Sequence, residues 1–509
     1  MCRCRVPSRR RKNLRLNDLC TDLSLDPRVA GLDILGLTAD SRAVRPGYLF
    51  AALQGSAMDG RRFIPDAAAK GAVAVLSDAV DPAYAEKLAF IADANPRRRL
   101  ALMAAAFFGA QPETIVAVTG TSGKTSVANF AMQLWALLGH KAASLGTLGL
   151  LGPGLHEKGA HTTPDPVELH RLLHTAVAAG CQHLALEASS HGLDQFRLDG
   201  VKLRAAAFTN LSRDHMDYHA TAEEYFSAKL RLFSALLPPD GAAVIDMDGE
   251  YGPRVAACAI QRGQRLIRYG RHGAELRLQD LAPHAGGLRF RFAAFGAEHE
   301  IDCPLIGGFQ AGNLLAALGL VIGAGAEPAA AIAALRHVIG VPGRMQLVAS
   351  RRNGAAIFVD YAHKPDALQT ALLAARPHAS GRLVVVFGCG GDRDRGKRPL
   401  MGGIAARLAD RVYVTDDNPR SEQPEAIRAA IMAACPGAIE IGDRRSAILA
   451  AVAELAPGDL LLLAGKGHEQ GQIVGAETRP FDDAAEARLA VSAADAGSNP
   501  GSETYGSKG

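Results

Sequence analysis

A glycine-rich stretch between an apolar strand pattern and an apolar helix pattern contains the first residues that could do chemistry. It follows a strand predicted over 115–119 and consists of Gly120, Thr121, Ser122, Gly123, Lys124, Thr125 and Ser126. Backbone N–H groups at the start of a helix bind phosphate oxygens, and the Lys124 ammonium neutralises their charge. The hydroxyl of Thr125 or Ser126 is suited to ligate Mg²⁺. We therefore predict nucleotide binding, with a plain strand–helix turn as the alternative.

Charged and imidazole side chains follow two further apolar runs. Glu187 lies at the end of the run 183–189, and the segment 209–219 carries Asp214, His215, Asp217 and His219. A carboxylate at the end of a buried strand is costly unless it is paired or bound to a metal. The two groups therefore indicate metal ligands, whereas one histidine alone would more often be structural.

The elements that must position these residues have the pattern of an α/β protein. Apolar strand patterns at 183–189, 204–211 and 242–248 alternate with helical patterns, as in buried parallel sheets. A third block from about residue 343 contains apolar strands that each end in a polar or glycine-rich loop, where ligands bind in open α/β sheets. Short strands and helices are predicted at 48–53, 67–78 and 94–109, and antiparallel strands over 262–300.

The composition excludes several classes of protein. A chain of 509 residues is too long for one core. Its net charge of +4 is weak evidence for a polyanionic partner, so we predict no nucleic-acid binding. No apolar run reaches membrane-spanning length, so no membrane insertion is expected. Eight cysteines without a C-x-x-C pair indicate a reduced, cytoplasmic protein.

The order and spacing of further motifs resemble one enzyme family. "GTSGKTS", "EASSHGLDQFR" and "TNLSRDHMDYH" are followed by "VPGRMQ", "VDYAHKPDAL", "GCGGDRDRGKRPLM", "TDDNPR" and "AGKGHE". Over about residues 30–490 the chain resembles the Mur ligases of peptidoglycan synthesis. That family uses a shortened phosphate loop, which accounts for Val118 where the usual pattern has a glycine.

The resemblance implies a reaction and a set of small-molecule partners. An ATP-dependent carboxylate–amine ligase, with Mg²⁺ as cofactor, would join meso-2,6-diaminopimelate to UDP-N-acetylmuramoyl-L-alanyl-D-glutamate. The D-glutamate carboxylate would pass through an acyl phosphate, and ADP and phosphate would be released. The family resemblance also implies a monomer.

The fold class expected from the pattern and the resemblance is α/β with three domains. A flexible N-terminal extension over 1–15 precedes a smaller α/β domain over 16–110 that binds the UDP substrate. A central P-loop-type ATPase domain with a mostly parallel sheet covers 111–345. A Rossmann-like domain over 346–492 binds the amino acid, and a disordered tail covers 493–509.

The resemblance also assigns site residues. Lys124, Lys229 and His215 would be catalytic, and Thr125, Glu187, His215 and Lys229, as a carbamate, would hold the metal. ATP would be bound by residues 120–126, Asn313, Arg344 and Asp360. The UDP-dipeptide would be bound by Ala39, Ser41, Ser56, Ala57, Met58, Thr162, Thr163, Ser189, Gln195 and Arg197. Diaminopimelate would be bound by Arg393, Asp417, Asn418, Pro419, Arg420, Gly465 and Glu469.

Two of these assignments go against a plainer interpretation of the residues. Without the resemblance, Lys229 would be an exposed helix lysine and Arg420 a surface loop arginine. Selection of diaminopimelate over lysine requires a group that binds the second carboxylate, and Arg420 is placed for that role. Gln310 and Gln346 depart from the family pattern, the first near the adenine contacts and the second near a domain junction.

Two alternative functions remain at this point. A folylpolyglutamate synthetase shares the short loop and a similar ATPase core, although "DNPR" and "GCGGDRDRGKRP" suit a tripeptide synthetase better. A non-catalytic nucleotide-binding protein with a decayed site is the other alternative. The presence of Lys124, Glu187, His215 and Lys229 is evidence against decay.

Overall fold

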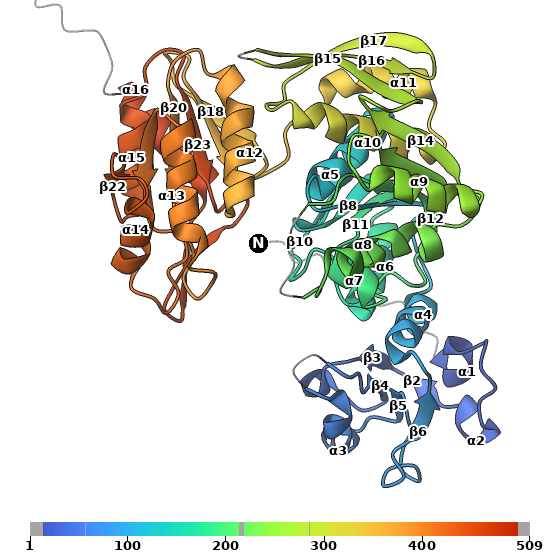
Figure 1. Ribbon diagram of the computed structural model, residues 1–509. Coiled ribbons are helices and arrows are strands. Elements are labelled where there is room, and N and C mark those ends of the chain that lie inside the picture. Colours follow the sequence, from blue (N-terminus) through green and yellow to red (C-terminus); the bar gives the residue numbers. More distant parts are fainter. Residues whose placement is uncertain (1–13, 56–57, 213–217, 285, 497–509) are drawn as a thin grey trace, which may run out of the picture. The chain divides into compact units, whose positions relative to one another are not determined.

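The structure is a computed structural model that describes residues 14–55, 58–212, 218–284 and 286–496 (Figure 1). The chain divides into two compact units. The first comprises residues up to 268 together with 316–331, and the second comprises 269–315 together with residues from 332 onwards. Within the described ranges, no helix is both long enough and apolar enough to cross a membrane.

The first unit begins with a small four-stranded parallel sheet. Its strands, in spatial order, are β3 (Gly36–Thr38), β4 (Tyr48–Ala51), β5 (Ala74–Ser77) and β6 (Ala89–Ala92). Around it lie β1 (Leu14–Arg15), α1 (Leu16–Leu19), α2 (Pro27–Ala30), β2 (Asp33–Ile34), η1 (Ser41–Ala43), η2 (Gly60–Phe63), α3 (Ile64–Ala69) and α4 (Pro96–Phe108). Apolar clusters cover both faces of the sheet, which is why its strands are almost wholly apolar.

A larger sheet follows in the same unit. Five neighbouring strands run parallel in the order β8 (Ala142–Gly146), β11 (His183–Glu187), β7 (Thr114–Thr119), β12 (Leu203–Phe208) and β13 (Ala242–Asp246). The edge beyond β8 is formed by antiparallel β9 (Gly149–Gly152) and β10 (Leu155–Glu157), and β14 (Arg265–Gly270) follows β13. The helical segments are α5 (Lys124–Leu137), α6 (Pro166–Ala178), α7 (Ser190–Asp194), α8 (Ala222–Arg231), η3 (Leu232–Leu236) and α9 (Gly252–Gln261).

The second unit begins with a β-meander. Tyr269 and Gly270 pair with the start of β15 (Leu276–His284), and β16 (Gly287–Ala294) and β17 (Ala297–Cys303) continue it as antiparallel strands. Antiparallel strands were expected over 262–300. β15 to β17 have that arrangement, but the end of β14 pairs with β15 as a parallel strand, so the expectation was wrong for that part. The segments α10 (Phe309–Gly323), α11 (Pro328–Ala334) and η4 (Leu335–His337) lead to the last sheet.

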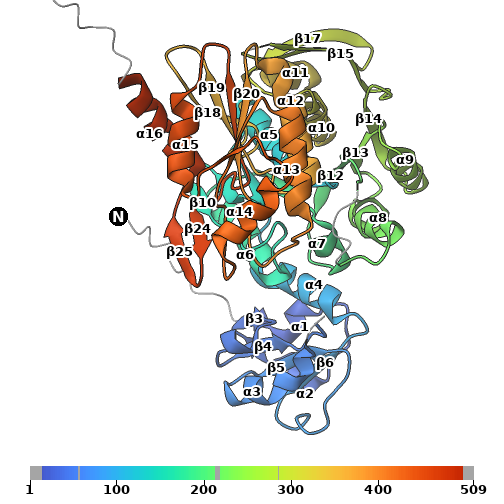
Figure 2. The ribbon, with the colours of Figure 1, turned by 60° about the vertical axis from the view of Figure 1, so that its left-hand side comes forward.

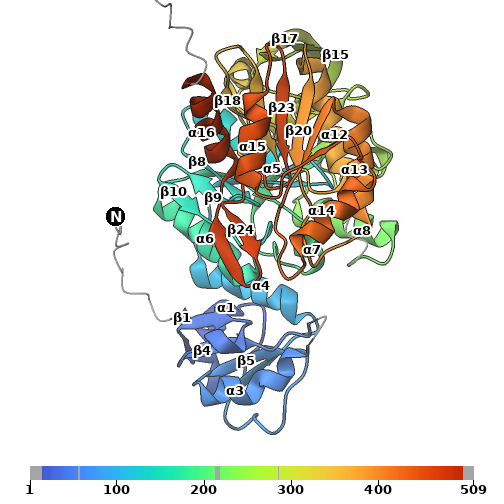
Figure 3. The same ribbon diagram turned by 90° about the vertical axis from the view of Figure 1, so that its left-hand side faces the viewer.

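The last sheet has six strands in the order β18 (Gln346–Ser350), β19 (Ala356–Asp360), β23 (Leu460–Ala464), β20 (Leu383–Phe387), β21 (Arg411–Val414) and β22 (Ile439–Glu440). β18 is antiparallel, and the others are parallel. One face packs against α12 (Pro365–Ala375), α13 (Lys397–Leu408) and α14 (Pro424–Met432), with η5 (Arg376–His378) after α12, and the other packs against α15 (Arg444–Ala453) and α16 (Asp483–Ala496) (Figure 2). The hairpin of β24 (Gly471–Val474) and β25 (Glu477–Pro480) is a separate sheet (Figure 3).

The described structure extends into both segments that were predicted as an extension or a tail. β1 begins at Leu14, and residues 1–13 lie outside the described ranges. α16 continues through Ala496 and so takes in residues 493–496 of the segment predicted as a tail. Asp495 accepts a hydrogen bond from Arg351 Nε at 2.6 Å, which ties the last turn of that helix to the end of β18.

Candidate active site

The phosphate loop connects β7 to α5 and is held by the segment after β12. Gly120 has a φ of 148°, and a Cβ there would lie 1.9 Å from Thr209 Oγ1, so the backbone requires glycine. The Ser122 N–H donates to Asn210 Oδ1 at 2.9 Å, and Thr209 Oγ1 donates to the Ser122 carbonyl at 2.7 Å. These contacts fix the loop at the carboxyl edge of the parallel sheet, beside the N-terminus of α5.

Two lysines converge on one carbonyl of this loop. Lys124 Nζ and Lys229 Nζ each donate to the Gly120 carbonyl at 2.8 Å. Lys229 is 1% exposed, and its ammonium lies 4.4 Å from the centre of the Tyr225 ring. The interpretation of Lys229 as an exposed lysine is therefore wrong. The reason is that the inner face of α8, with Tyr225 and Lys229, packs against the phosphate loop, where Tyr225 also hydrogen-bonds Thr121.

Glu187 has its carboxylate buried beside the first turn of α5. Thr125 Oγ1 donates to Oε2 at 3.0 Å, while Thr147 donates through its N–H to Oε1 at 2.8 Å and through its hydroxyl to Oε2 at 3.2 Å. A Cβ on Gly146 would lie 2.0 Å from Oε1, so this strand end leaves room for the carboxylate. Glu187 is 2% exposed, and these donors are all neutral. A buried carboxylate among neutral donors is suited to a divalent cation.

The predicted peptide-binding residues of this unit form a connected row next to Glu187. Thr163 Oγ1 donates to the Glu187 carbonyl at 2.8 Å and accepts from the Ser189 hydroxyl at 3.0 Å. Arg197 Nη1 donates to the Thr163 carbonyl at 2.6 Å, and Arg197 Nη2 donates to Gln195 Oε1 at 2.7 Å. Burial lowers the pKa of the Arg197 guanidinium. Thr162 joins the row through Thr147, with their hydroxyls 3.0 Å apart.

Several predicted residues lie elsewhere or outside the described ranges. Ala39 follows β3, Ser41 begins η1, and Met58 is 61% exposed, so these three lie in the small sheet region. Ser56, Ala57 and His215 lie outside the described residues, as do Asp214 and Asp217. Among the residues that are described, no three His, Cys, Asp or Glu side chains gather as a metal site.

The predicted ATP residues of the second unit lie around the end of β19 and the start of α10. Asp360 Oδ2 accepts from the Met345 N–H at 2.8 Å, and burial raises the pKa of its carboxyl. The Arg344 guanidinium lies 4.9 Å from the centre of the Tyr361 ring. Asn313 Nδ2 donates to Gln310 Oε1 at 2.9 Å, so the first departure from the family pattern orients a predicted adenine contact.

The second departure has a structural role. Gln346 Oε1 accepts from the Gly343 N–H at 2.9 Å. A Cβ on Gly343 would lie 2.3 Å from the backbone nitrogen of His468, so this turn packs closely against the loop after β23. Gln346 thus stabilises the turn that carries Arg344.

The predicted amino-acid residues cluster at the carboxyl edge of the six-stranded sheet. Asn418 Nδ2 donates to Glu469 Oε2 at 3.0 Å. A Cβ on Gly465 would lie 2.6 Å from Asp417 Oδ2, and burial raises the pKa of the Asp417 carboxyl. The loops after β21 and β23 therefore meet at Asp417, Asn418, Gly465 and Glu469.

Arg420 has a left-handed backbone conformation in this cluster. Its φ is 54°, and its N–H donates to the Ile473 carbonyl of β24 at 3.1 Å. Its Nη1 donates to the Gly391 carbonyl at 2.8 Å. A Cβ on Gly391 would lie 1.9 Å from the carbonyl of Pro419, so the glycine loop is needed to receive this turn. Arg393, in the same glycine-rich loop, is exposed.

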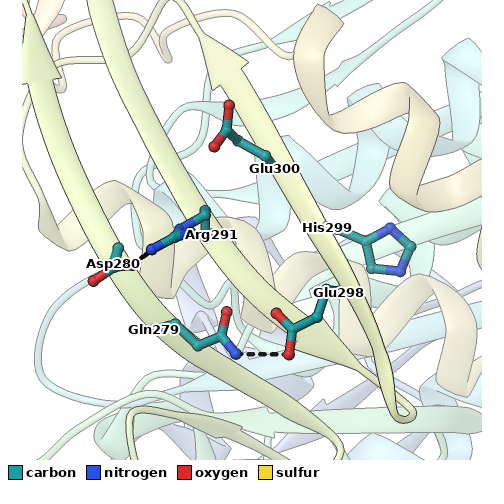
Figure 4. Close-up of a pocket in the computed structure, with 6 residues that line it drawn as sticks. All are labelled: Gln279, Asp280, Arg291, Glu298, His299 and Glu300. Carbon is teal, nitrogen blue, oxygen red and sulfur yellow. Dashed lines mark hydrogen bonds and ion pairs between the residues drawn. The ribbon is translucent and has the colours of Figure 1, made fainter.

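A hollow on the exposed sheet β15–β17 does not contain the predicted site. It is lined by Gln279, Asp280, Arg291, Glu298, His299 and Glu300 (Figure 4). Arg291 pairs with Asp280, and Gln279 Nε2 donates to Glu298 Oε1 at 2.8 Å. Four of the six lining residues therefore pair with one another.

Sequence reasoning missed four residues that hold predicted site residues of their own unit in place. They are Thr147, Asn210, Tyr225 and Lys466. Thr147 and Asn210 each follow the end of a parallel strand, which was the signal available for both. Tyr225 lies one helical turn before Lys229, and Lys466 lies within "AGKGHE", whose neighbours were assigned.

Family models and relatives agree with this arrangement. The Mur ligase family catalytic domain matches residues 33–108, the Mur ligase middle domain 118–321, and the Mur ligase glutamate ligase domain 343–467. The chain is 55% identical to the UDP-N-acetylmuramoyl-L-alanyl-D-glutamate–2,6-diaminopimelate ligase of Bradyrhizobium diazoefficiens, over 92% of this chain and 97% of that protein. It is 52% identical to the enzyme of the same name from Mesorhizobium japonicum, over 94% of this chain and 99% of that one.

Solved structures extend the comparison. A structure of a UDP-N-acetylmuramoyl-L-alanyl-D-glutamate–2,6-diaminopimelate ligase has a TM-score of 0.72 at 34% identity, covering 95% of this chain and 99% of that one. Folylpolyglutamate synthase of Mycobacterium tuberculosis, solved with ADP and AMPPCP, has a TM-score of 0.57 at 20% identity, covering 70% and 88%, and so shares only the fold.

The phosphate loop, the parallel sheets and these relatives define the protein as an ATP-dependent amide ligase. The chain belongs to the Mur ligase family. The resemblance stated from the motifs and the α/β fold class are both confirmed.

Proposed function

We propose that this protein joins an amine of meso-2,6-diaminopimelate to the D-glutamate side-chain carboxylate of UDP-N-acetylmuramoyl-L-alanyl-D-glutamate, with conversion of ATP to ADP and phosphate. Relatives that cover nearly the whole chain at 50–55% identity carry this activity in their names. The structural observation that carries the proposal is the joining of Asn418 to Glu469 beside Arg420, because these groups offer opposite charges to an amino acid with two charged ends.

The proposed reaction requires positive groups near the phosphate loop of the first unit. The substrate carboxylate and the γ-phosphate of ATP repel each other, so positive groups must offset both. Lys124, the first residue of α5, would hold the phosphates at the N-terminus of that helix. The carboxylate then attacks the γ-phosphorus, ADP leaves, and the amine attacks the acyl phosphate and expels phosphate.

The residues around Glu187 fit a Mg²⁺ ion. Thr125 offers a hydroxyl and Glu187 a buried carboxylate with neutral donors, and His215 is proposed as a further ligand. When bound, the ion would offset the charge that builds up on the transferred phosphoryl group. Thr147 would keep the carboxylate of Glu187 in place.

Lys229 is proposed to carry a carbamate. Two ammonium groups that share one carbonyl repel each other, and both Lys124 and Lys229 donate to Gly120. Reaction of the neutral Lys229 amine with CO₂, which forms an N–C bond and releases a proton, would give an anionic carbamate. The carbamate would replace this repulsion with attraction and would supply oxygen ligands for Mg²⁺. The buried position of Lys229 also protects such a group from exchange with solvent.

The remaining roles follow the same reasoning. Thr162, Thr163, Ser189, Gln195 and Arg197 would bind the peptide part of the UDP substrate. Ala39, Ser41, Ser56, Ala57 and Met58 would bind its uridine and diphosphate. Asn313, Arg344 and Asp360 would bind ATP. The cytoplasmic location and the monomeric state implied by the family remain predictions.

A competition assay tests the proposal. Purified protein receives ATP, the UDP-dipeptide and equal amounts of lysine and meso-diaminopimelate, and the products are separated by mass. We expect the diaminopimelate product to dominate and phosphate release to require both the dipeptide and the amino acid. Release with a folate substrate, or none with any amino acid, would contradict the proposal.

A further inference from the structure

Lys466 is a buried lysine that none of the roles above uses. It lies two residues after the end of β23, between Gly465 and the loop that carries Glu469, and its side chain is 0% exposed. Burial of an ammonium group is costly unless hydrogen bonds and a nearby negative charge compensate for the lost water. The groups that bind its ammonium therefore indicate the role of this lysine.

Both partners of Lys466 belong to the proposed diaminopimelate site. Its Nζ donates to Asn418 Oδ1 at 3.0 Å and lies 3.5 Å from Glu469 Oε2. Because Lys466 has no exposed surface, it does not reach a ligand itself. It touches the two residues that would.

The contact with Lys466 fixes the orientation of the Asn418 amide. Asn418 Oδ1 accepts from Lys466 Nζ and from the Ile473 N–H at 3.0 Å, while Nδ2 donates to Glu469 Oε2 at 3.0 Å. A flipped amide would place its NH₂ group against two donors and its oxygen against a carboxylate. One N–H of the amide is used by Glu469, which leaves the second for a substrate carboxylate.

Glu469 is held in the same way. Its carboxylate accepts hydrogen bonds from Asn418 Nδ2, from the Lys466 ammonium and from the Tyr361 hydroxyl. About a third of its side chain is exposed, at 34%, so part of the carboxylate remains accessible to a substrate ammonium. Lys466 thus orients one group suited to a carboxylate and one suited to an ammonium.

We propose that Lys466 is a positioning residue for the amino-acid substrate, which holds Asn418 and Glu469 in the orientation that binds the two charged ends of meso-diaminopimelate. This inference rests on the proposed function, because it takes that amino acid as the substrate. A lysine that only stabilised the fold would affect all substrates equally.

The test is a set of steady-state measurements on Lys466→Met, Asn418→Ala and the double variant. Methionine has a similar length and volume and removes only the charge and the donors. We expect Lys466→Met to lower kcat/KM for meso-diaminopimelate by about 10- to 100-fold, as for loss of a charged hydrogen bond, with KM for ATP and for the UDP-dipeptide changed by less than about twofold. The double variant should be no worse than the more severe single variant by more than about threefold, because Lys466 acts through Asn418.

The controls make the outcome decisive. Arg445→Met removes an exposed cation paired with Glu486 in the same sheet region, and should keep kcat/KM for diaminopimelate within about twofold. If Lys466→Met does not fold, Lys466→Gln takes its place. An unchanged kcat/KM for diaminopimelate, an equal fall in the kcat/KM of every substrate, or multiplying effects in the double variant would overturn the inference. If the unmodified protein does not use meso-diaminopimelate at all, the proposed function fails instead.

Discussion

At the scale of single residues, Lys229 offers the sharpest test of the phosphate site. It is buried and donates to the same carbonyl as Lys124. If it carries a carbamate, Lys229→Ala should reduce ATP-dependent phosphate release by at least about 1000-fold, and short carboxylic acids added to the assay should restore part of it. Lys202→Ala, which changes an exposed lysine of the same unit, should behave as the unmodified protein. A Lys229→Ala variant with normal turnover and no response to added acids would remove the carbamate from the proposal.

Arg420 should determine which amino acid is accepted. Its Nη1 is held by the Gly391 carbonyl, and the other guanidinium donors can meet the distal carboxylate of diaminopimelate, which lysine lacks. Arg420→Ala should lose about 2–4 kcal/mol of discrimination, or roughly 30- to 1000-fold in the ratio of kcat/KM for diaminopimelate to that for lysine. The KM values of ATP and the UDP-dipeptide should change little. An unaltered ratio would show that another group selects the substrate.

At the scale of elements, the phosphate loop depends on one backbone conformation. Gly120→Ala would force a Cβ to within 1.9 Å of Thr209 Oγ1 at a φ of 148°. The loop must move, and a displacement of about 1 Å at a reacting group costs on the order of 100-fold in rate. We expect that loss in kcat/KM for ATP, with the circular dichroism spectrum retained. Gly249→Ala is the matched control, because a Cβ at Gly249 meets no atom within 4 Å. Equal effects of the two substitutions would contradict this role of Gly120.

For the molecule as a whole, the stability of the first unit should depend on the protonation of Asp246, at the end of β13. Partial burial raises the pKa of its carboxyl from 3.8 to about 6. The folded chain therefore binds this proton more tightly than the unfolded chain, and stability is lost as the pH rises from about 4 to 6. Asp246→Asn keeps the acceptor for the Asp248 N–H and removes the titration. At pH 7 it should raise the free energy of unfolding by about 1–2 kcal/mol.

The measurement is urea unfolding at pH 4 and pH 7, followed by tryptophan fluorescence. Trp135 is the single tryptophan, and it lies in the core of the first unit, so its signal reports that unit. The difference between Asp246→Asn and the unmodified protein should be largest at pH 7 and small at pH 4. A difference that does not change with pH would show that the carboxyl of Asp246 does not titrate in this range.

Features that depend on local patterns could be predicted from the sequence. The strand–loop–helix pattern around Gly120 predicted the phosphate loop, and apolar runs ending in polar residues predicted β11, β12 and β13. These features follow from chain neighbours, because a buried parallel strand must be apolar and a loop must carry its polar groups at the strand end. The serial order of the motifs indicated the family.

Which side chains meet depends on how distant parts of the chain pack together. Lys229 lies 109 residues from Gly120 and Lys466 lies 48 residues from Asn418, yet each pair forms a hydrogen bond. Helix periodicity shows which residues of α8 share a face, but it does not show what that face packs against. The order of strands in a sheet brings loops distant in the chain to one edge, and that order follows from the packing of the whole sheet. For this reason the residues that bear chemistry could be recognised in the sequence, whereas the residues that hold them in place became visible only in the fold.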